Sequence, residues 1–176
     1  AVPYRGNPLA VVLDGSGLST EEMQHFTNWT NLSEATFLLP STQAGADYQV
    51  RIFCPGRELP FAGHPTLGSC HAWLQAGGTP RAPLNADGSQ RIVQECAKGL
   101  VALRRTGTQL AFAAPELTRH APDAAMLQDV TRALGLTAGQ VRAAQVLDNG
   151  PVWLGLLLDS AETVLGLQPD HAALRH

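Results

Sequence analysis

Positive charge is scarce in this chain of 176 residues. Lysine and arginine together number 12 against 15 aspartates and glutamates, the formal net charge is −3, and Lys98 is the single lysine. A protein that neutralises a phosphate backbone needs clustered basic side chains, so we expect no nucleic-acid partner. The hydrophobic fraction of 44% is that of an ordinary globular protein.

Long apolar runs are also missing. No stretch reaches the roughly 18 to 20 residues that a membrane-spanning helix needs. Residues 1–5 lack the basic and apolar regions of a signal peptide. We therefore expect a cytoplasmic protein with no membrane partner.

The chain has only three cysteines, and their spacing matches no paired motif. Cys54, Cys70 and Cys96 are odd in number and form no Cys-x-x-Cys pattern. This usage favours reduced thiols over a disulfide framework, and we expect them to act as small buried hydrophobic residues.

Apolar periodicity and turn residues predict short strands interrupted by a few helices. A capping-box pattern of Ser19 and Glu22 predicts a helix at residues 20–29. A second helix, at 65–76, carries almost no charge and is therefore expected to be buried. Strands are predicted at 8–14, 35–39, 47–53, 91–96, 100–104, 109–113, 141–147 and 152–158, and further helices at 122–135 and from 169 onward.

A low-charge helix among short, mostly antiparallel strands indicates an α+β fold with a barrel-like or strongly curved sheet around that helix. No earlier strand is present to pair with the one at 8–14, and the helix that opens at 169 has no stop signal before residue 176. We therefore expect the chain to be part of a longer protein.

Three motifs lie in the first 70 residues. They are Arg5-Gly6-Asn7-Pro8-Leu9-Ala10-Val11-Val12, Asn31-Leu32-Ser33-Glu34-Ala35-Thr36-Phe37 and Glu58-Leu59-Pro60-Phe61-Ala62-Gly63-His64-Pro65-Thr66-Leu67-Gly68. In this order, together with Arg51-Ile52-Phe53 and Val93-Gln94-Glu95, they resemble the amino-terminal half of the phenazine-biosynthesis PhzF-like family. The Gly-His-Pro-Thr sequence that opens a helix is the most specific part.

The resemblance implies the fold of diaminopimelate epimerase, in which two similar halves each wrap a barrel around a central helix and hold the substrate between them. Residues 1–115 would then form the amino-terminal barrel domain. Residues 116–176 would form a connecting helix and the start of the second, similar domain, which is truncated here. In the family, that second half supplies a further acidic residue and another glycine-containing helix start.

The resemblance also implies an activity and a catalytic residue. Family members are cofactor-independent isomerases that shift a proton within a small carboxylate-bearing substrate, and they often form homodimers. The catalytic glutamate of the family matches Glu34. Here this implies an isomerase acting on a small unsaturated amino or hydroxy acid, with Glu34 as general base and then acid.

The surroundings of Glu34 suit proton transfer on physical grounds as well. Apolar neighbours such as Phe37 flank the carboxyl at the start of a strand, and partial burial there would raise its pKa. Such a carboxyl can take a proton from an activated carbon and return it at another position. From the residues alone, the alternative is a solvated loop carboxylate or a turn cap with Asn31 and Ser33.

The helix start after Ala62 suits a substrate carboxylate, because the first turn of a helix presents unpaired N–H groups and the positive end of the helix dipole. Gly63 allows close approach to the backbone, and the amides of His64, Thr66 and Leu67 are expected to be available. The imidazole of His64 could hydrogen-bond the substrate or help to protonate it. The alternative for His64 is a helix-capping residue with no ligand.

Two other polar residues carry no assigned chemistry. Asn7 either caps the Gly-Asn-Pro turn or faces the cleft, and the sequence leaves both open. Arg51 is expected on the polar face of a strand.

Other kinds of site are disfavoured. The epimerase thiol has no counterpart in Ala62-Gly63-His64, and Cys70 would lie about 7–8 Å further along the helix. Gly15-Ser16-Gly17 lacks the third glycine of a dinucleotide fingerprint. His64, Cys70 and His71 are irregularly spaced for zinc, so we expect neither a cofactor nor a metal. The second functional hypothesis is a catalytically silent module of the same fold that binds small carboxylates.

Overall fold

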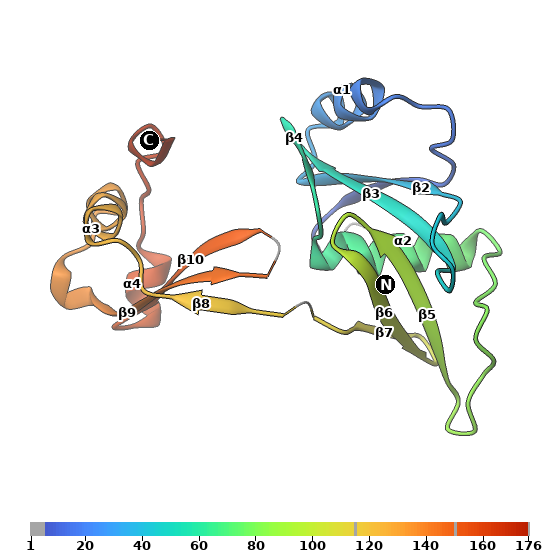
Figure 1. The fold of residues 1–176 in the computed structure, drawn as a ribbon. Helices are drawn as coiled ribbons and strands as arrows, with labels where there is room; N and C mark the ends of the chain where they lie inside the picture. The colour runs from blue at the N-terminus through green and yellow to red at the C-terminus, as the bar shows by residue number, and fades with distance from the viewer. Residues whose placement is uncertain (1–5, 115, 150, 176) are drawn as a thin grey trace. The chain divides into compact units, whose positions relative to one another are not determined.

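The computed structural model describes residues 6–114, 116–149 and 151–175 of the chain. Arg5 of the first motif, residue 115 at the expected domain boundary and His176 at the end of the last predicted helix lie outside these residues. The chain divides into two compact units, residues 1–115 and 116–176 (Figure 1). No helix in the described ranges is long and apolar enough to cross a membrane.

The described part of the first unit, residues 6–114, is one mixed sheet with two helices. Its sheet has the order β1-β2-β3-β5-β6-β7, and β4 pairs with β3. The pairings are antiparallel except for β1 with β2 and β3 with β5, where the chain passes through a helix between the two strands. The elements are β1 Leu9–Val12, α1 Thr20–Thr30, β2 Glu34–Leu39, β3 Tyr48–Cys54, β4 Arg57–Leu59, α2 Gly63–Gln75, β5 Ser89–Cys96, β6 Gly99–Thr106 and β7 Gln109–Phe112.

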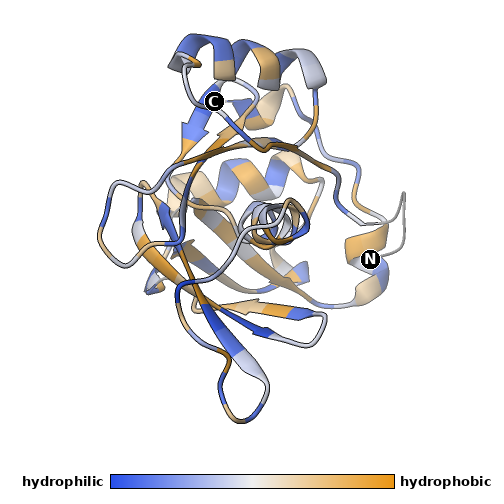
Figure 2. Cartoon of the chain, turned by 90° about the vertical axis from the view of Figure 1, so that its right-hand side faces the viewer, coloured by the Kyte–Doolittle hydropathy of each residue, from blue (hydrophilic) through white to orange (hydrophobic). Residues whose placement is uncertain are grey.

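The sheet curls around α2, as the absence of charge on that helix predicted. Figure 2 looks along α2, with the strands of the first unit around it. The α+β class and the curved, mostly antiparallel sheet around a central helix are therefore confirmed. The main core lies between α2 and the sheet and contains Leu38, Tyr48, Val50, Ile52, Phe61, Ala62, Cys70, Ile92, Cys96, Val101 and Leu103.

Strict alternation along β2 divides its side chains between the two faces of the sheet. Ala35 and Phe37 pack with Met23 of α1 in a second core cluster. Thr36 instead accepts a hydrogen bond from Ser69 of α2 at 2.8 Å. Because side chains two residues apart share a face, Glu34 lies on the α2 side of the strand.

Buried polar contacts fix α2 against the sheet. In addition to the Ser69 bond, Gln94 of β5 donates to the Thr66 hydroxyl of α2 at 3.1 Å and accepts from the Tyr48 hydroxyl at 3.1 Å. Gln94 and Thr66 are fully buried. Since a buried polar group left unpaired is costly, these bonds favour one register of α2.

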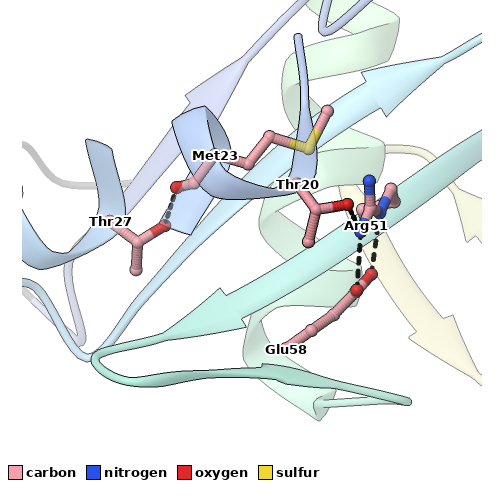
Figure 3. Close-up of polar contacts among 5 residues, drawn as sticks. All are labelled: Thr20, Met23, Thr27, Arg51 and Glu58. Atoms are coloured by element: carbon pink, nitrogen blue, oxygen red, sulfur yellow. Dashed lines mark hydrogen bonds and ion pairs between the residues drawn. The ribbon is translucent and has the colours of Figure 1, made fainter. Parts of the chain in front are cut away.

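The face of β3 opposite α2 carries Arg51, as the alternation predicted (Figure 3). Its guanidinium donates to both carboxylate oxygens of Glu58 at 2.8 and 2.7 Å and to the hydroxyl of Thr20 at 3.0 Å. These bonds tie β3, β4 and α1 together. Arg51 therefore has a structural partner for its charge and no link to the α2 face.

The second unit has one three-stranded antiparallel sheet in the order β10-β9-β8. The expected helix from residue 169 is wrong, because within the described residues 169–175 only a short 3-10 turn forms, at Ala173–Arg175. Strand β4 of the first unit and β8 and α4 of the second were not predicted; at three to five residues they are too short to show periodicity. The elements are β8 Thr118–His120, α3 Ala124–Ala133, a 3-10 turn Ala138–Gln140, β9 Val141–Asp148, β10 Val152–Leu158 and α4 Ala161–Leu165.

The second unit buries little apolar surface. Among its described hydrophobic residues only Ala133 and Val146 are buried, whereas Trp153, Leu157 and Leu165 are 60%, 63% and 86% exposed. We expect residues 116–176 expressed alone to show no cooperative thermal transition in near-ultraviolet circular dichroism, because so small a core cannot offset chain entropy. A sharp two-state transition would contradict this expectation.

Candidate active site

The turn between α1 and β2 places Glu34 at the head of α2. Helix α1 ends at Thr30, and the left-handed backbone of its C-cap Asn31, with φ of 52°, turns the chain towards β2. Asparagine adopts this conformation more readily than most residues. Glu34 is the first residue of β2, and Gly63 and His64 are the first two residues of α2.

The side chains of Glu34 and His64 face each other. Oε2 of Glu34 lies 3.3 Å from Nε2 of His64, and the two side chains are 17% and 33% exposed. Both atoms are buried, and among the described residues neither has a partner with hydrogen-bond geometry. The site thus holds a carboxylate and an imidazole in reach of each other and of solvent, with bonding capacity left for a ligand.

Asn7 extends this pair. Its side-chain nitrogen lies 3.4 Å from Nδ1 of His64, and its oxygen accepts a hydrogen bond from the Ser33 hydroxyl at 3.0 Å. The sequence left open whether Asn7 caps a turn or faces the cleft, and the structure places its side chain against His64. Ser33, the neighbour of Glu34, thus bonds to Asn7, a contact that the sequence did not predict.

Among the residues that the structure describes, no side chain caps the amino end of α2. Its N-cap residue is Ala62, whereas the side chains of Ser19 and Asp123 accept backbone N–H bonds at the starts of α1 and α3. The N–H groups of Gly63 and His64 precede the first intrahelical bond, so they point out of the helix end. Together with the helix dipole they suit an anion.

The expectation for the Thr66 amide is wrong. The Thr66 N–H donates to the carbonyl of Ala62 at 3.1 Å, because Thr66 is the fourth residue of α2 and closes its first helical bond. The Thr66 hydroxyl, in turn, accepts from Gln94 within the core. Whether Thr66 affects substrate binding stays a prediction, but its contacts with Ala62 and Gln94 position α2.

Replacing Thr66 with valine should lower stability by about 1–3 kcal/mol, because the Gln94 amide loses its buried acceptor while the side-chain volume is kept. Urea unfolding would measure the loss, and Thr66→Ser should restore most of it. A valine variant as stable as the wild type would show that the Gln94 bond contributes nothing.

Gly63 has a packing role in addition to the ligand contact expected for its backbone. A Cβ at this position would lie 3.2 Å from Cζ of Phe112 in β7, closer than side chains normally pack. Phe112 also packs edge-on against Phe61, with ring centroids 5.5 Å apart. A larger residue at 63 would push this ring and disturb the helix start.

The three cysteines are free thiols, as predicted. Cys70 and Cys96 are buried in the α2 core, and Cys54 is half-buried. Burial raises the pKa of the Cys70 thiol to about 11. Because the thiolate is the reactive form, Cys70 is unsuited to proton abstraction near neutral pH.

Comparison with known proteins places this geometry in a family. The model of the phenazine biosynthesis-like protein family, PhzC-PhzF, matches residues 1–176. The chain is 41% identical over 180 residues to antisense-enhancing sequence 1 of Schizosaccharomyces pombe, covering 97% of this chain and 58% of that protein. It is 36% identical over 176 residues to trans-2,3-dihydro-3-hydroxyanthranilate isomerase of Pseudomonas aeruginosa, covering 98% and 59%.

A solved structure agrees with these relatives. The structure of a predicted epimerase from Pseudomonas aeruginosa superimposes with a TM-score of 0.77 and 30% identity, over 95% of this chain and 58% of the other. The chain therefore spans somewhat more than half the length of the proteins it matches. The full-length family match and these relatives show that the chain belongs to the phenazine biosynthesis-like PhzC-PhzF family.

Proposed function

We propose that the protein is a cofactor-independent isomerase that shifts a proton within a small unsaturated amino or hydroxy acid, with Glu34 as general base and acid. The contact that carries this proposal is the 3.3 Å approach of the Glu34 carboxylate to the His64 imidazole at the uncapped head of α2. A base, a second proton-bearing group and free amide donors then surround one small volume.

The substrate class follows from the site and from the relatives. Free N–H groups at the helix end suit a carboxylate, and one relative is named as an isomerase of trans-2,3-dihydro-3-hydroxyanthranilate. A small acid with a carbon–hydrogen bond next to a double bond fits both the helix end and the named activity of this relative. Cytoplasmic location and a homodimer stay predictions.

The proposed reaction needs no oxidant or reductant. The substrate carboxylate accepts hydrogen bonds from the amides of Gly63 and His64, which fixes the acid beside Glu34. The Glu34 carboxylate takes a proton from the activated carbon, the double bond moves, and the resulting carboxylic acid returns a proton to a different carbon. His64 hydrogen-bonds the group that gains negative charge between the two steps.

Deuterium uptake separates this isomerase from a silent carboxylate-binding module. The natural full-length protein would be incubated in deuterated water with trans-2,3-dihydro-3-hydroxyanthranilate as the first probe, and with simpler unsaturated amino acids. An isomerase should yield rearranged product with solvent deuterium at the newly protonated carbon. Saturable binding without exchange or rearrangement of the bound acid would instead identify a binding module.

A further inference from the structure

A chain of contacts reaches the His64 ring from the side opposite Glu34. The hydroxyl of Ser33 donates to the side-chain oxygen of Asn7 at 3.0 Å, which leaves the amide nitrogen of Asn7 to face Nδ1 of His64 at 3.4 Å. On the other side, Nε2 of His64 faces Oε2 of Glu34 at 3.3 Å. Ser33 and Glu34 are adjacent in sequence, so one turn supplies both ends of the chain of contacts.

These contacts select one protonation form of the imidazole. An amide nitrogen only donates, so Nδ1 must accept, and a neutral imidazole then carries its proton on Nε2. That proton is then on the ring nitrogen that faces Oε2 of Glu34 at 3.3 Å, a contact without hydrogen-bond geometry among the described residues. Turning the Asn7 amide over would require a proton on Nδ1 and, in a neutral ring, would set an Nε2 lone pair against an ionised carboxylate.

We propose that Asn7, oriented by Ser33, is a positioning residue that holds His64 as the neutral Nε2–H tautomer, with the proton on the side of the ring that faces Glu34. In this form His64 offers its Nε2–H to substrate bound beside Glu34 and does not compete for the substrate proton as a second base. The predicted effect of Asn7 on turnover rests on the proposed function, whereas the assignment of the His64 tautomer does not.

The tautomer is measurable directly. In 15N-labelled natural full-length protein, long-range proton–nitrogen correlations distinguish Nε2–H, Nδ1–H and the doubly protonated ring, and the His64→Gln variant identifies the His64 signals. At a pH at which the ring is neutral, the wild type should show the Nε2–H pattern. An Nδ1–H pattern in the wild type would overturn the proposal.

Substitutions of Asn7 and Ser33 test whether the Asn7 amide sets the tautomer of His64. Asn7→Asp replaces the donor at Nδ1 by an acceptor and should move His64 to the Nδ1–H or doubly protonated pattern, whereas Ser33→Ala should give a mixture. Asn31→Asp adds the same charge at an exposed residue of the turn between α1 and β2, which also carries Ser33, and should leave the pattern unchanged. An Asn7→Asp variant in which His64 keeps the wild-type Nε2–H pattern would contradict the proposal that Asn7 sets the tautomer.

Turnover provides the second measurement. Asn7→Asp should lower kcat by about 10- to 100-fold with little change in KM, because the wrong tautomer impairs the chemical step more than binding. If the nuclear magnetic resonance patterns change as stated but no form of the protein turns over any probe, the proposed isomerase function fails and the tautomer assignment stands. Asn7 is exposed, so these variants should keep the near-ultraviolet circular dichroism of the wild type.

Discussion

Replacing Glu34 with glutamine should lower turnover by about 10²- to 10⁴-fold or more, since general base and acid catalysis by one positioned group contributes this much. The amide keeps the size of the side chain and can still pack beside His64, but it cannot accept a proton from carbon. Initial rates and solvent deuterium incorporation would measure the loss. Substrate affinity should change much less, because the amides of Gly63 and His64 are untouched.

A matched control is available in the same unit. Glu58→Gln removes a carboxylate that pairs with Arg51 on the sheet face opposite α2, so kcat should stay within about threefold of the wild type. Equal losses in Glu34→Gln and Glu58→Gln would point to general destabilisation. A fully active Glu34→Gln variant would remove Glu34 from the mechanism.

Replacing Glu95 with alanine should destabilise the protein more than any surface change, by about 2–5 kcal/mol. Glu95 in β5 is 3% exposed, yet its carboxylate accepts from the Thr42 backbone N–H at 2.7 Å, the Thr42 hydroxyl at 2.5 Å and the Gln43 N–H at 3.0 Å. Gln49 of β3 adds a fourth bond at 3.3 Å. Without the carboxylate, these donors in the loop between β2 and β3 lose their acceptor.

Urea unfolding of Glu95→Ala beside Glu58→Ala would test this expectation. Glu58 shares a partly exposed ion pair, and its loss should cost about 1 kcal/mol or less. Similar losses in the two variants would show that the Glu95 contacts add no more than a surface pair.

The same carboxylate should make stability depend on pH. Burial raises the pKa of Glu95, but the hydrogen bonds from Thr42 and Gln43 outweigh it, so the pKa lies below its ordinary value of 4.5. A lowered folded-state pKa contributes stability that is complete above the ordinary value and is lost as pH falls through the folded one. The wild type should therefore lose more stability below about pH 4.5 than Glu95→Gln does.

Local patterns predicted the elements that are long or capped. The Ser19–Glu22 capping box forms at the start of α1, and the uncharged helix lies inside the curved sheet. Alternation along β3 assigned Arg51 to the correct face of that strand. In these cases the information lies within a few residues of sequence.

Local sequence patterns could not predict features that depend on contacts between residues far apart in the sequence. The Thr66 prediction failed because the helix begins at Gly63, two residues before the predicted start, which turns the Thr66 amide into an internal helical donor. The contact of Asn7 with His64 joins residues 57 positions apart and has no local signature. The packing of Gly63 against Phe112 is similarly non-local.

The most direct test is a crystal structure of the natural full-length Glu34→Gln protein with a bound unsaturated amino acid. The account predicts that the ligand carboxylate lies on the amides of Gly63 and His64, with a ligand carbon about 3–3.5 Å from the side chain of residue 34. A ligand bound elsewhere, or a residue 34 side chain turned away from His64, would contradict it.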